Sequence, residues 1–251
     1  MDLPILMYHH LEPDGAPITP YAIPAGVFAT HLEVLRSAGF VTLSFHQLFE
    51  VLEGKRKRPA KAAVLTFDDG YESFRTLALP ALVAQGMTAT VFVVAGAIGG
   101  VNHWDLPQGY PRRALMDEVA LKEIVAAGME IGSHGWAHRD LTACTESELA
   151  EEFVRSRQEI RDCLGIQADF FAYPYGHYSR SYFPLLERAG YRGAVTIFSD
   201  EPTVTHARYA MRRVLAHAGD TAWRFRLKLS PLYLHYVAWR DRKGGRGNAA
   251  R

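Results

Sequence analysis

The sequence predicts an α/β fold, a deformed (β/α) barrel of parallel strands similar to a TIM barrel, and two observations favour it. Short apolar runs alternate with segments of helical period along most of the 251 residues. The connections between them are short, which favours parallel strands joined by helices. This alternation, without an internal repeat, favours a closed or nearly closed barrel over an open sheet. We expect the barrel to occupy residues 1–218 and a basic amphipathic helix and tail to occupy 219–251.

The expected strands are the apolar and β-branched runs, and the expected helices lie between them. The strands are placed at 4–9, 41–43, 63–67, 88–94, 129–133, 169–173 and 193–198. The helices are placed at 27–35, 45–52, 73–85, 114–127, 145–164 and 182–189. Ser44 is the expected N-cap of the second helix, and Thr145 with Glu148 forms a capping box that opens the fifth. Residues 96–113 form a long glycine-rich loop that we expect at the rim of a site.

Charge and cysteine content argue against several classes of protein. Lys and Arg number 28 against 27 Asp and Glu, so the overall balance gives no reason to expect a nucleic-acid partner. Cys144 and Cys163 form no C-x-x-C pattern, so neither a disulfide framework nor a cysteine zinc site is expected. No stretch is long and apolar enough to span a membrane, and residues 1–4 lack the charge and apolar run of a signal peptide. The expected location is therefore the cytoplasm.

The C-terminal segment differs in character from the rest of the chain. Between residues 221 and 240, aromatic residues and leucines are interleaved with Arg and Lys. One interpretation is a terminal helix, interrupted at Pro231, that packs on the barrel. The other is an interfacial helix on an anionic membrane, which would give a peripheral contact through residues 221–246 at the inner membrane face.

The expected strand at 63–67 ends in two adjacent carboxylates, Asp68 and Asp69, followed by Gly70. Burying a carboxylate costs free energy unless something pairs with it, so two in succession call for a cation. A glycine at the next position lets the backbone turn sharply or approach a ligand closely. The alternative interpretation is an Asp-Gly turn after a strand, without a function.

His134 and His138 follow the expected strand at 129–133 and are four residues apart. This spacing can bring two imidazoles to one metal if the segment turns helically, although two such histidines are often only surface residues. In a barrel the strand ends converge on one mouth, so both would lie near Asp69. One carboxylate and two imidazoles form a three-ligand site that suits zinc or another divalent first-row metal.

Three segments, each at an expected strand end, together resemble the motifs of the polysaccharide deacetylases, the carbohydrate esterases of family 4 that share the NodB homology domain. These segments are 66–70 (TFDDG), 133–138 (SHGWAH) and 172–176 (AYPYG), and the resemblance spans roughly residues 4–214. The opening segment 4–9 (PILMYH) resembles the branch that includes the poly-N-acetylglucosamine deacetylases. In that branch a histidine near the N-terminus takes a catalytic role.

The resemblance implies a role for each matching residue. Asp69, His134 and His138 would bind a divalent metal, most plausibly zinc, with cobalt, nickel, manganese or iron as alternatives. Asp68 would be the general base that activates a metal-bound water, and His9 the general acid that protonates the departing amine. The backbone N–H of Tyr175 would help to hold the oxyanion. His217 competes with His9 for the role of the acid.

The chain also departs from the family pattern. Gly135 stands where the family often has a small hydroxyl residue, and we expect it to loosen the hydrogen bonding of this loop. Ala172 replaces an arginine that orients the base, and Arg212 or Arg213 could substitute for it. Trp136, Tyr175 and Trp104 could offer a stacking surface for a sugar ring, or could be packed in the core.

The resemblance implies a metal-dependent hydrolase that removes N-acetyl groups, or less favourably O-acetyl groups, from a glycan or a lipid-linked sugar. The basic aromatic tail favours the lipid-linked sugar at the inner membrane face. Two alternatives stay open at this point. One is a barrel amidohydrolase that acts on a small non-sugar amide. The other is a catalytically silent glycan-binding protein, which the missing arginine would explain.

Overall fold

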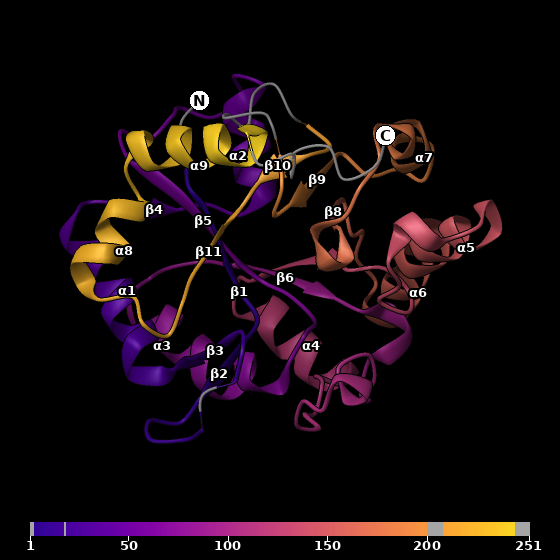
Figure 1. Ribbon diagram of the computed structural model, residues 1–251, viewed down its shortest axis with the longest axis horizontal. Helices are drawn as coiled ribbons and strands as arrows, with labels where there is room; N and C mark the ends of the chain where they lie inside the picture. The colour runs from indigo at the N-terminus through magenta and orange to yellow at the C-terminus, as the bar shows by residue number, and fades with distance from the viewer. Residues whose placement is uncertain (1–2, 18, 200–207, 244–251) are drawn as a thin grey trace.

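The computed structural model describes residues 3–17, 19–199 and 208–243, which form a parallel sheet wrapped by helices (Figure 1). The sheet has nine strands within these residues, in the order β10-β9-β8-β7-β6-β5-β1-β11, with β4 beside β5. Every pairing in it is parallel. The strands are β1 (Ile5–Tyr8), β4 (Val41–Thr42), β5 (Ala62–Phe67), β6 (Thr90–Val93), β7 (Glu130–Ser133), β8 (Phe170–Ala172), β9 (Gly193–Thr196), β10 (Met211–Arg212) and β11 (Val214–Leu215).

The two ends of this sheet are joined by one extended segment. Strand β10 pairs with β9, and β11 pairs with β1, although only Arg213 separates β10 from β11 in the chain. The segment therefore bridges from the last strand back to the first, and the sheet is nearly closed into a barrel. The predicted barrel of parallel strands is confirmed.

Side chains that alternate along the strands belong to two separate cores, as the period of two requires. Ile5, Val64 and Phe92 pack together inside the barrel with the helix at 45–52, which closes the N-terminal end of the strands. Their neighbours, among them Leu6 and Leu65, pack outward against the surrounding helices. The strands are thus buried on both faces, which is why they are continuously apolar in the sequence.

The helices surround the sheet close to their expected positions. They are α1 (Ala25–Ser37), α2 (Phe45–Leu52), α3 (Leu79–Ala84), α4 (Glu118–Ala126), α5 (Glu146–Ala150), α6 (Ser156–Leu164) and α7 (Phe183–Arg188), then α8 (Ala222–Lys228) and α9 (Pro231–Lys243) at the end of the chain. The capping boxes at Ser44 and Thr145 are both confirmed. A π-helical turn precedes α3, and another joins α5 to α6. The fourth helix begins later than the sequence suggests, because Asp117 caps it.

The C-terminal segment forms α8 and α9, which break at Pro231 as predicted. Phe225 of α8 stacks on His31 of α1, with ring centroids 3.9 Å apart. Asp241 of α9 forms a buried ion pair with Arg212 of β10, at 2.6 Å. The interpretation as helices packed on the barrel is therefore confirmed. The domain boundary at 218 stays a prediction.

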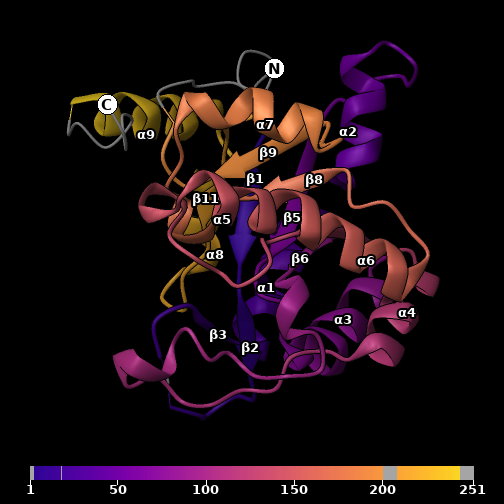
Figure 2. The same cartoon turned by 90° about the vertical axis from the view of Figure 1, so that its right-hand side faces the viewer.

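The position of α9 is distinctive. Figures 1 and 2 both show it across the end of the barrel that is opposite to the small sheet of β2 (His10–Glu12) and β3 (Ala22–Pro24). Pro231, its first residue, lines a groove together with Pro4 and Ala62, which lie at the beginning of β1 and β5. Helix α9 therefore begins beside the N-terminal ends of β1 and β5, and Asp241 in its last turn reaches Arg212 of β10. None of the helices in the described residues is long and apolar enough to cross a bilayer.

Candidate active site

A cavity of about 370 Å³ opens at the C-terminal ends of the strands. Its wall includes the residues that follow β1, β5, β7 and β8, and it is rimmed by residues from the 96–113 loop. The sequence-predicted site residues that line it are His9, Asp68, Asp69, His134, His138, Tyr175 and Arg213. The expected convergence of strand ends on one mouth is therefore observed.

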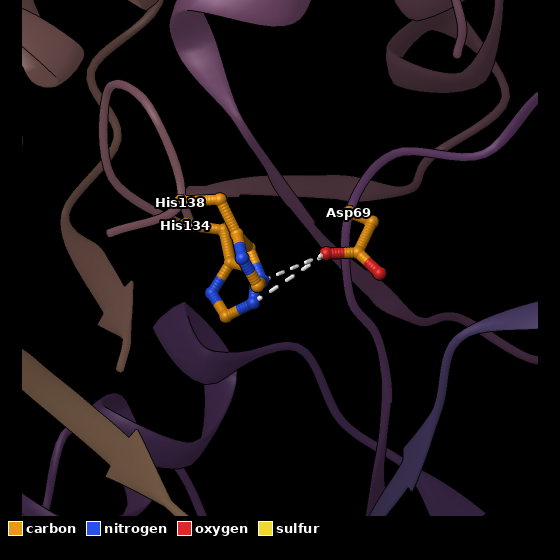
Figure 3. A group of neighbouring side chains, drawn as sticks. All are labelled: Asp69, His134 and His138. Carbon is orange, nitrogen blue, oxygen red and sulfur yellow. Dashed lines mark ion pairs between the residues drawn. The ribbon is translucent and has the colours of Figure 1, made fainter. Parts of the chain in front are cut away.

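Asp69, His134 and His138 lie together at the bottom of this cavity, with one potential ligand atom from each within 4.8 Å of the others. The Oδ1 atom of Asp69 is 3.6 Å from His134 Nε2 and 3.4 Å from His138 Nε2 (Figure 3). All three residues are buried, at 4%, 2% and 7% exposure respectively. The two imidazoles thus point at the same carboxylate oxygen.

The chemistry of these atoms fits a bound cation. His134 Nδ1 is 2.8 Å from the carbonyl oxygen of Ala172, which can only accept a hydrogen bond, so the lone pair of His134 lies on Nε2 and faces Asp69. Within the described residues, the buried Oδ1 of Asp69 has no hydrogen-bond partner. Burial, with the charges of Asp68 and Asp105, raises the pKa of the Asp69 carboxyl well above its usual range. A divalent cation would satisfy this oxygen and reverse that effect.

The backbone at the first of these residues is strained. Asp69 has a left-handed φ of 73° and is followed by Gly70 at 79°. A side chain at position 70 would also crowd Val93, because its Cβ would lie 3.1 Å from Val93 Cγ1. Both the positive φ and the close approach of Val93 therefore favour glycine at this position. Because β5 ends at Phe67, the two aspartates lie beyond the strand, and strand alternation does not set their directions. The left-handed turn directs Asp69 toward the histidines instead, and such strain is typical of functional sites.

The segment from His134 to His138 is not helical. A helical turn was the expected way to bring two histidines four residues apart to one metal, and the structure does it differently. Gly135 and His138 both have positive φ, at 83° and 56°, and this folds the segment back on itself. The buried carboxylate of Glu152 holds the fold by accepting hydrogen bonds from the N–H groups of Trp136, at 2.8 Å, and Ala137, at 3.0 Å. The two imidazoles therefore converge through a turn that Glu152 supports.

Glu152 also explains why residue 135 is a glycine. A Cβ atom at position 135 would collide with the Glu152 carboxylate, so the glycine makes room for this carboxylate. The expectation that Gly135 loosens the loop was therefore wrong. Sequence reasoning missed Glu152, although one signal was available: it falls on the same face of the expected 145–164 helix as the apolar residues Leu149 and Phe153.

Asp68 is held by Arg213 in a bidentate ion pair. The two guanidinium nitrogens lie 2.5 and 2.7 Å from Oδ1 and Oδ2 of the carboxylate. Burial by itself would raise the pKa of Asp68, but the charge and hydrogen bonds of Arg213, together with the charges of His134 and His9, outweigh it and lower the pKa to about 2. Asp68 is therefore ionised throughout the neutral range.

Of the two arginines suggested as a substitute at Ala172, the structure brings Arg213 to the site. Adjacent residues of an extended segment point in opposite directions, so Arg212 faces outward to Asp241 while Arg213 faces into the barrel. The carbonyl of Ala172 has a separate part in the site, because it orients His134.

His9 lines the cavity, half-buried, with its ring against that of Tyr21 at 4.6 Å between centroids. Burial lowers the pKa of His9 to about 4, and Arg213 and His134 act in the same direction while Asp68 opposes them. His217, the competing acid, is exposed, and its backbone N–H donates to Asp220. His217 is not among the described residues that line the cavity.

The aromatic residues divide between the cavity and the core. Trp104 stacks on the ring of His138, with centroids 4.6 Å apart, and Tyr175 contacts the same ring at 4.7 Å with a left-handed φ of 59°. Both line the cavity. Trp136 is not among the described lining residues, and the guanidinium of Arg155 lies 3.7 Å from its ring. Of the two alternatives for Trp136, the structure favours packing, because its ring lies against the outer core.

Comparisons with known proteins agree with this geometry. A family model described as polysaccharide deacetylase matches residues 55–194. YxkH of Bacillus subtilis (strain 168), classed with the polysaccharide deacetylases, is 28% identical over 217 residues, which are 86% of this chain and 72% of that protein. The poly-beta-1,6-N-acetyl-D-glucosamine N-deacetylase of Staphylococcus aureus (strain MRSA252) is 23% identical over 209 residues, covering 79% of this chain and 69% of the relative.

The solved structure of IcaB from Ammonifex degensii superposes with a TM-score of 0.74 at 26% identity, and covers 91% of this chain and 97% of IcaB. The matched family model covers more than half of the sequence and includes both aspartates and both histidines of the cavity. The chain therefore belongs to the polysaccharide deacetylase family and is a hydrolase of the deacetylase type.

Proposed function

We propose that this protein is a metal-dependent hydrolase that removes N-acetyl groups from a glycan. One observation supports this most strongly: a buried group of one carboxylate and two imidazoles lies beside a second carboxylate that Arg213 keeps ionised. The names of the Staphylococcus aureus relative and its counterparts favour poly-N-acetylglucosamine as the class of substrate.

Asp69, His134 and His138 would hold the metal ion, and zinc suits this donor set best, with cobalt, nickel, manganese and iron as alternatives. When bound, such an ion polarises the acyl oxygen and lowers the pKa of water from about 16 toward about 7. The positively charged site would also stabilise the ionised form of Asp69.

Asp68 is the proposed general base, because it is ionised, buried and held in one orientation by two charge-assisted hydrogen bonds. It accepts the proton of the attacking water. The backbone N–H of Tyr175 is proposed to donate to the oxyanion that develops at the acyl carbon.

His9 is the proposed acid. An amine is a poor leaving group without a proton, so amide hydrolysis needs an acid more than ester hydrolysis does, and this favours N-acetyl over O-acetyl substrates. The lowered pKa of His9 implies a neutral imidazole in the resting site at pH 7. His9 therefore has to gain its proton during turnover before it passes it to the nitrogen.

The proposal is tested by a matched pair of substitutions. Asp68→Asn is expected to retain stoichiometric metal and to lose turnover by a factor on the order of 100 or more, since general acid–base catalysis contributes about 10² to 10⁴. Asp69→Asn is expected to lose the metal itself. Metal content is measured by mass spectrometry, and turnover by acetate release from N-acetylglucosamine oligomers.

Three results would contradict the proposal. If the wild-type protein is purified without stoichiometric metal and stays inactive after addition of each candidate metal, metal-dependent catalysis is excluded. Turnover unchanged in Asp68→Asn would remove Asp68 as the base. Faster hydrolysis of small ureides than of N-acetylglucosamine oligomers would favour an amidohydrolase instead. The cytoplasmic location stays a prediction, to be checked by cell fractionation.

A further inference from the structure

The outer faces of α8 and α9 expose large apolar side chains. On α9, Leu232 is 82% exposed, Tyr236 54% and Trp239 52%, and their spacing places all three along one stripe of the helix. On α8, Trp223 is 71% exposed and Leu227, four residues later, is 43% exposed. We name these five side chains the C-terminal apolar surface.

These side chains are not needed to hold the helices on the barrel. The inner faces do this through buried Phe225, Leu234 and Val237. Two buried ion pairs add to this packing: Lys228 with Asp220 and Arg212 with Asp241. The exposed aromatic and aliphatic groups therefore make little contribution to the fold, and so many on neighbouring helices indicate an interaction surface.

The charges around this surface have one sign. Arg224, Arg226, Arg240 and Lys243 are exposed on the same two helices. Asp241 is the only acidic residue between 221 and 243, and it is 2% exposed because it pairs with Arg212 and Arg240. Outside these helices, Glu33 of α1 lies near Trp223, but it is paired with Arg36. The partner that complements this surface is therefore anionic and has an apolar interior.

We propose that the C-terminal apolar surface binds an anionic lipid bilayer, with Trp223, Tyr236 and Trp239 at the headgroup level. Exposed Trp, Tyr and Leu surrounded by Arg and Lys are the composition of helices that lie in a membrane interface. Only a few side chains insert, so binding is reversible and depends on both anionic lipid and salt. Residues 244–246, the end of the membrane segment expected from the sequence, lie outside the described residues.

The fold determines how the bound protein is oriented. Helix α9 begins beside the N-terminal ends of β1 and β5, whereas the cavity opens at the C-terminal ends of the strands. A bilayer bound at α9 would then lie on the side of the barrel away from β2, whose His10 lines the cavity, and Figures 1 and 2 both show α9 separated from β2 and β3. The cavity then opens away from the lipid. A sugar linked directly to a lipid of the same bilayer would not reach it, and the accessible substrate is a glycan that extends away from the membrane.

Binding is tested by sedimentation with vesicles of phosphatidylglycerol and phosphatidylcholine. The wild type is expected to bind vesicles rich in phosphatidylglycerol, and to dissociate at high salt. Arg224→Gln with Lys243→Gln is expected to weaken partitioning by about tenfold or more, since each basic residue near an anionic surface contributes several-fold. Trp223→Ala with Trp239→Ala is expected to abolish detectable binding.

Val119→Ala is the matched control, because Val119 is 74% exposed on α4, away from α9 (Figure 1). It is expected to bind as the wild type does. All variants should retain acetate release on soluble oligomers, which shows that they fold. Equal binding of wild type and Trp223→Ala/Trp239→Ala, or no binding by the wild type, would overturn the proposal. A dimer in lipid-free solution that becomes a monomer in the same variant, without vesicle binding, would assign the surface to a second copy.

Orientation is tested separately with brominated lipids, which quench tryptophan fluorescence at short range. Trp223 and Trp239 are expected to be quenched in the bound wild type. A second protein carries Trp223→Phe, Trp239→Phe and Leu106→Trp, because Leu106 lies in the loop at the cavity and is 40% exposed. Its fluorescence is expected to be insensitive to the bromines while it sediments with vesicles. Because Trp104 and Trp136 remain, the reference is the Trp223→Phe/Trp239→Phe protein with Leu106 intact, and quenching beyond that reference would show that the cavity faces the bilayer.

Discussion

At the scale of single residues, Arg213 holds Asp68, the proposed general base, in one orientation. Both are buried, and their side chains are joined by two hydrogen bonds across a separation of 145 residues in the sequence. A planar guanidinium fixes a carboxylate in a way that a lysine ammonium cannot, because only the guanidinium offers two parallel donors. The orientation of the proposed base thus depends on the type of cation as well as on its charge.

We expect Arg213→Lys to retain the fold and to lower kcat by about ten- to a hundredfold, with a smaller change in KM, because the carboxylate keeps its charge but loses its fixed orientation. Arg212→Lys is the matched control. It lies in the adjacent position and pairs with Asp241 instead, so it should reduce thermal stability and leave kcat unchanged. Equal loss of kcat in both variants would indicate a general effect on the barrel.

We expect Glu152 to support metal binding through the turn between His134 and His138. Its carboxylate accepts the N–H groups of the turn between the two histidines, so Glu152→Gln replaces one acceptor with a donor. We expect the affinity for zinc, measured by competition with a chromophoric chelator, to fall by about tenfold or more. Glu151→Gln is the control on the same helix, where the side chain is partly exposed and pairs with Arg139. Unchanged affinity in Glu152→Gln would limit Glu152 to a role in packing.

At the scale of secondary structure, α2 is tied to the closed end of the barrel by charges. Glu130, at the start of β7, accepts the backbone N–H groups of Phe45 and His46 at 2.7 and 2.9 Å, which satisfies donors at the first turn of the helix. The His46 imidazole bridges Glu130 and Asp169. Hydrogen bonds to Asp169 and then to Glu130 raise the pKa of His46 to about 9.

This raised pKa has a consequence for stability. The folded protein binds the His46 proton more tightly than the unfolded chain does. Protonated His46 therefore contributes fully to the stability of the fold below its unfolded pKa of about 6.5. It declines as the pH rises and is lost above about 9. We expect urea unfolding to show stability that falls from pH 6.5 to 9 in the wild type, and a shallower fall in His46→Gln. An identical pH dependence in the two proteins would contradict this assignment.

At the scale of the whole molecule, the proposed metal would bind only the folded chain. Its ligands come from the ends of β5 and β7, which unfolding separates. Ligand binding to the folded state stabilises it, by about 2.7 kcal/mol at a hundredfold excess over Kd. We therefore expect removal of the metal to lower Tm by about 5–10 °C for a chain of this size, and zinc to restore it.

Asp69→Asn provides the control for that measurement, since its Tm should not respond to chelator or to zinc. The readout is thermal and does not depend on activity, so it separates metal binding from catalysis. The wild-type Tm could also be equal with and without chelator in a protein shown to contain metal. That result would mean that the metal is not bound by Asp69, His134 and His138.

The sequence by itself determined the barrel and the two aspartates and two histidines at its mouth. Apolar runs predict buried parallel strands, and parallel strands bring their C-terminal ends to one side. Asp68, Asp69, His134 and His138 follow such runs directly, so local patterns were enough to bring them together. The capping boxes at Ser44 and Thr145 were predictable for the same reason, because a cap depends on residues within one turn.

Only the tertiary structure decided the contacts between distant segments. The choice of Arg213 over Arg212 depends on which side of the last strand segment faces the interior, and a shift of one residue would reverse it. Glu152 reaches its turn from a helix 16 residues away, and His9 lines the cavity while His217 does not. The position of α9 relative to the cavity likewise depends on the path of the whole chain. Patterns of a few residues specify elements, whereas the faces that meet are selected by packing across the entire barrel.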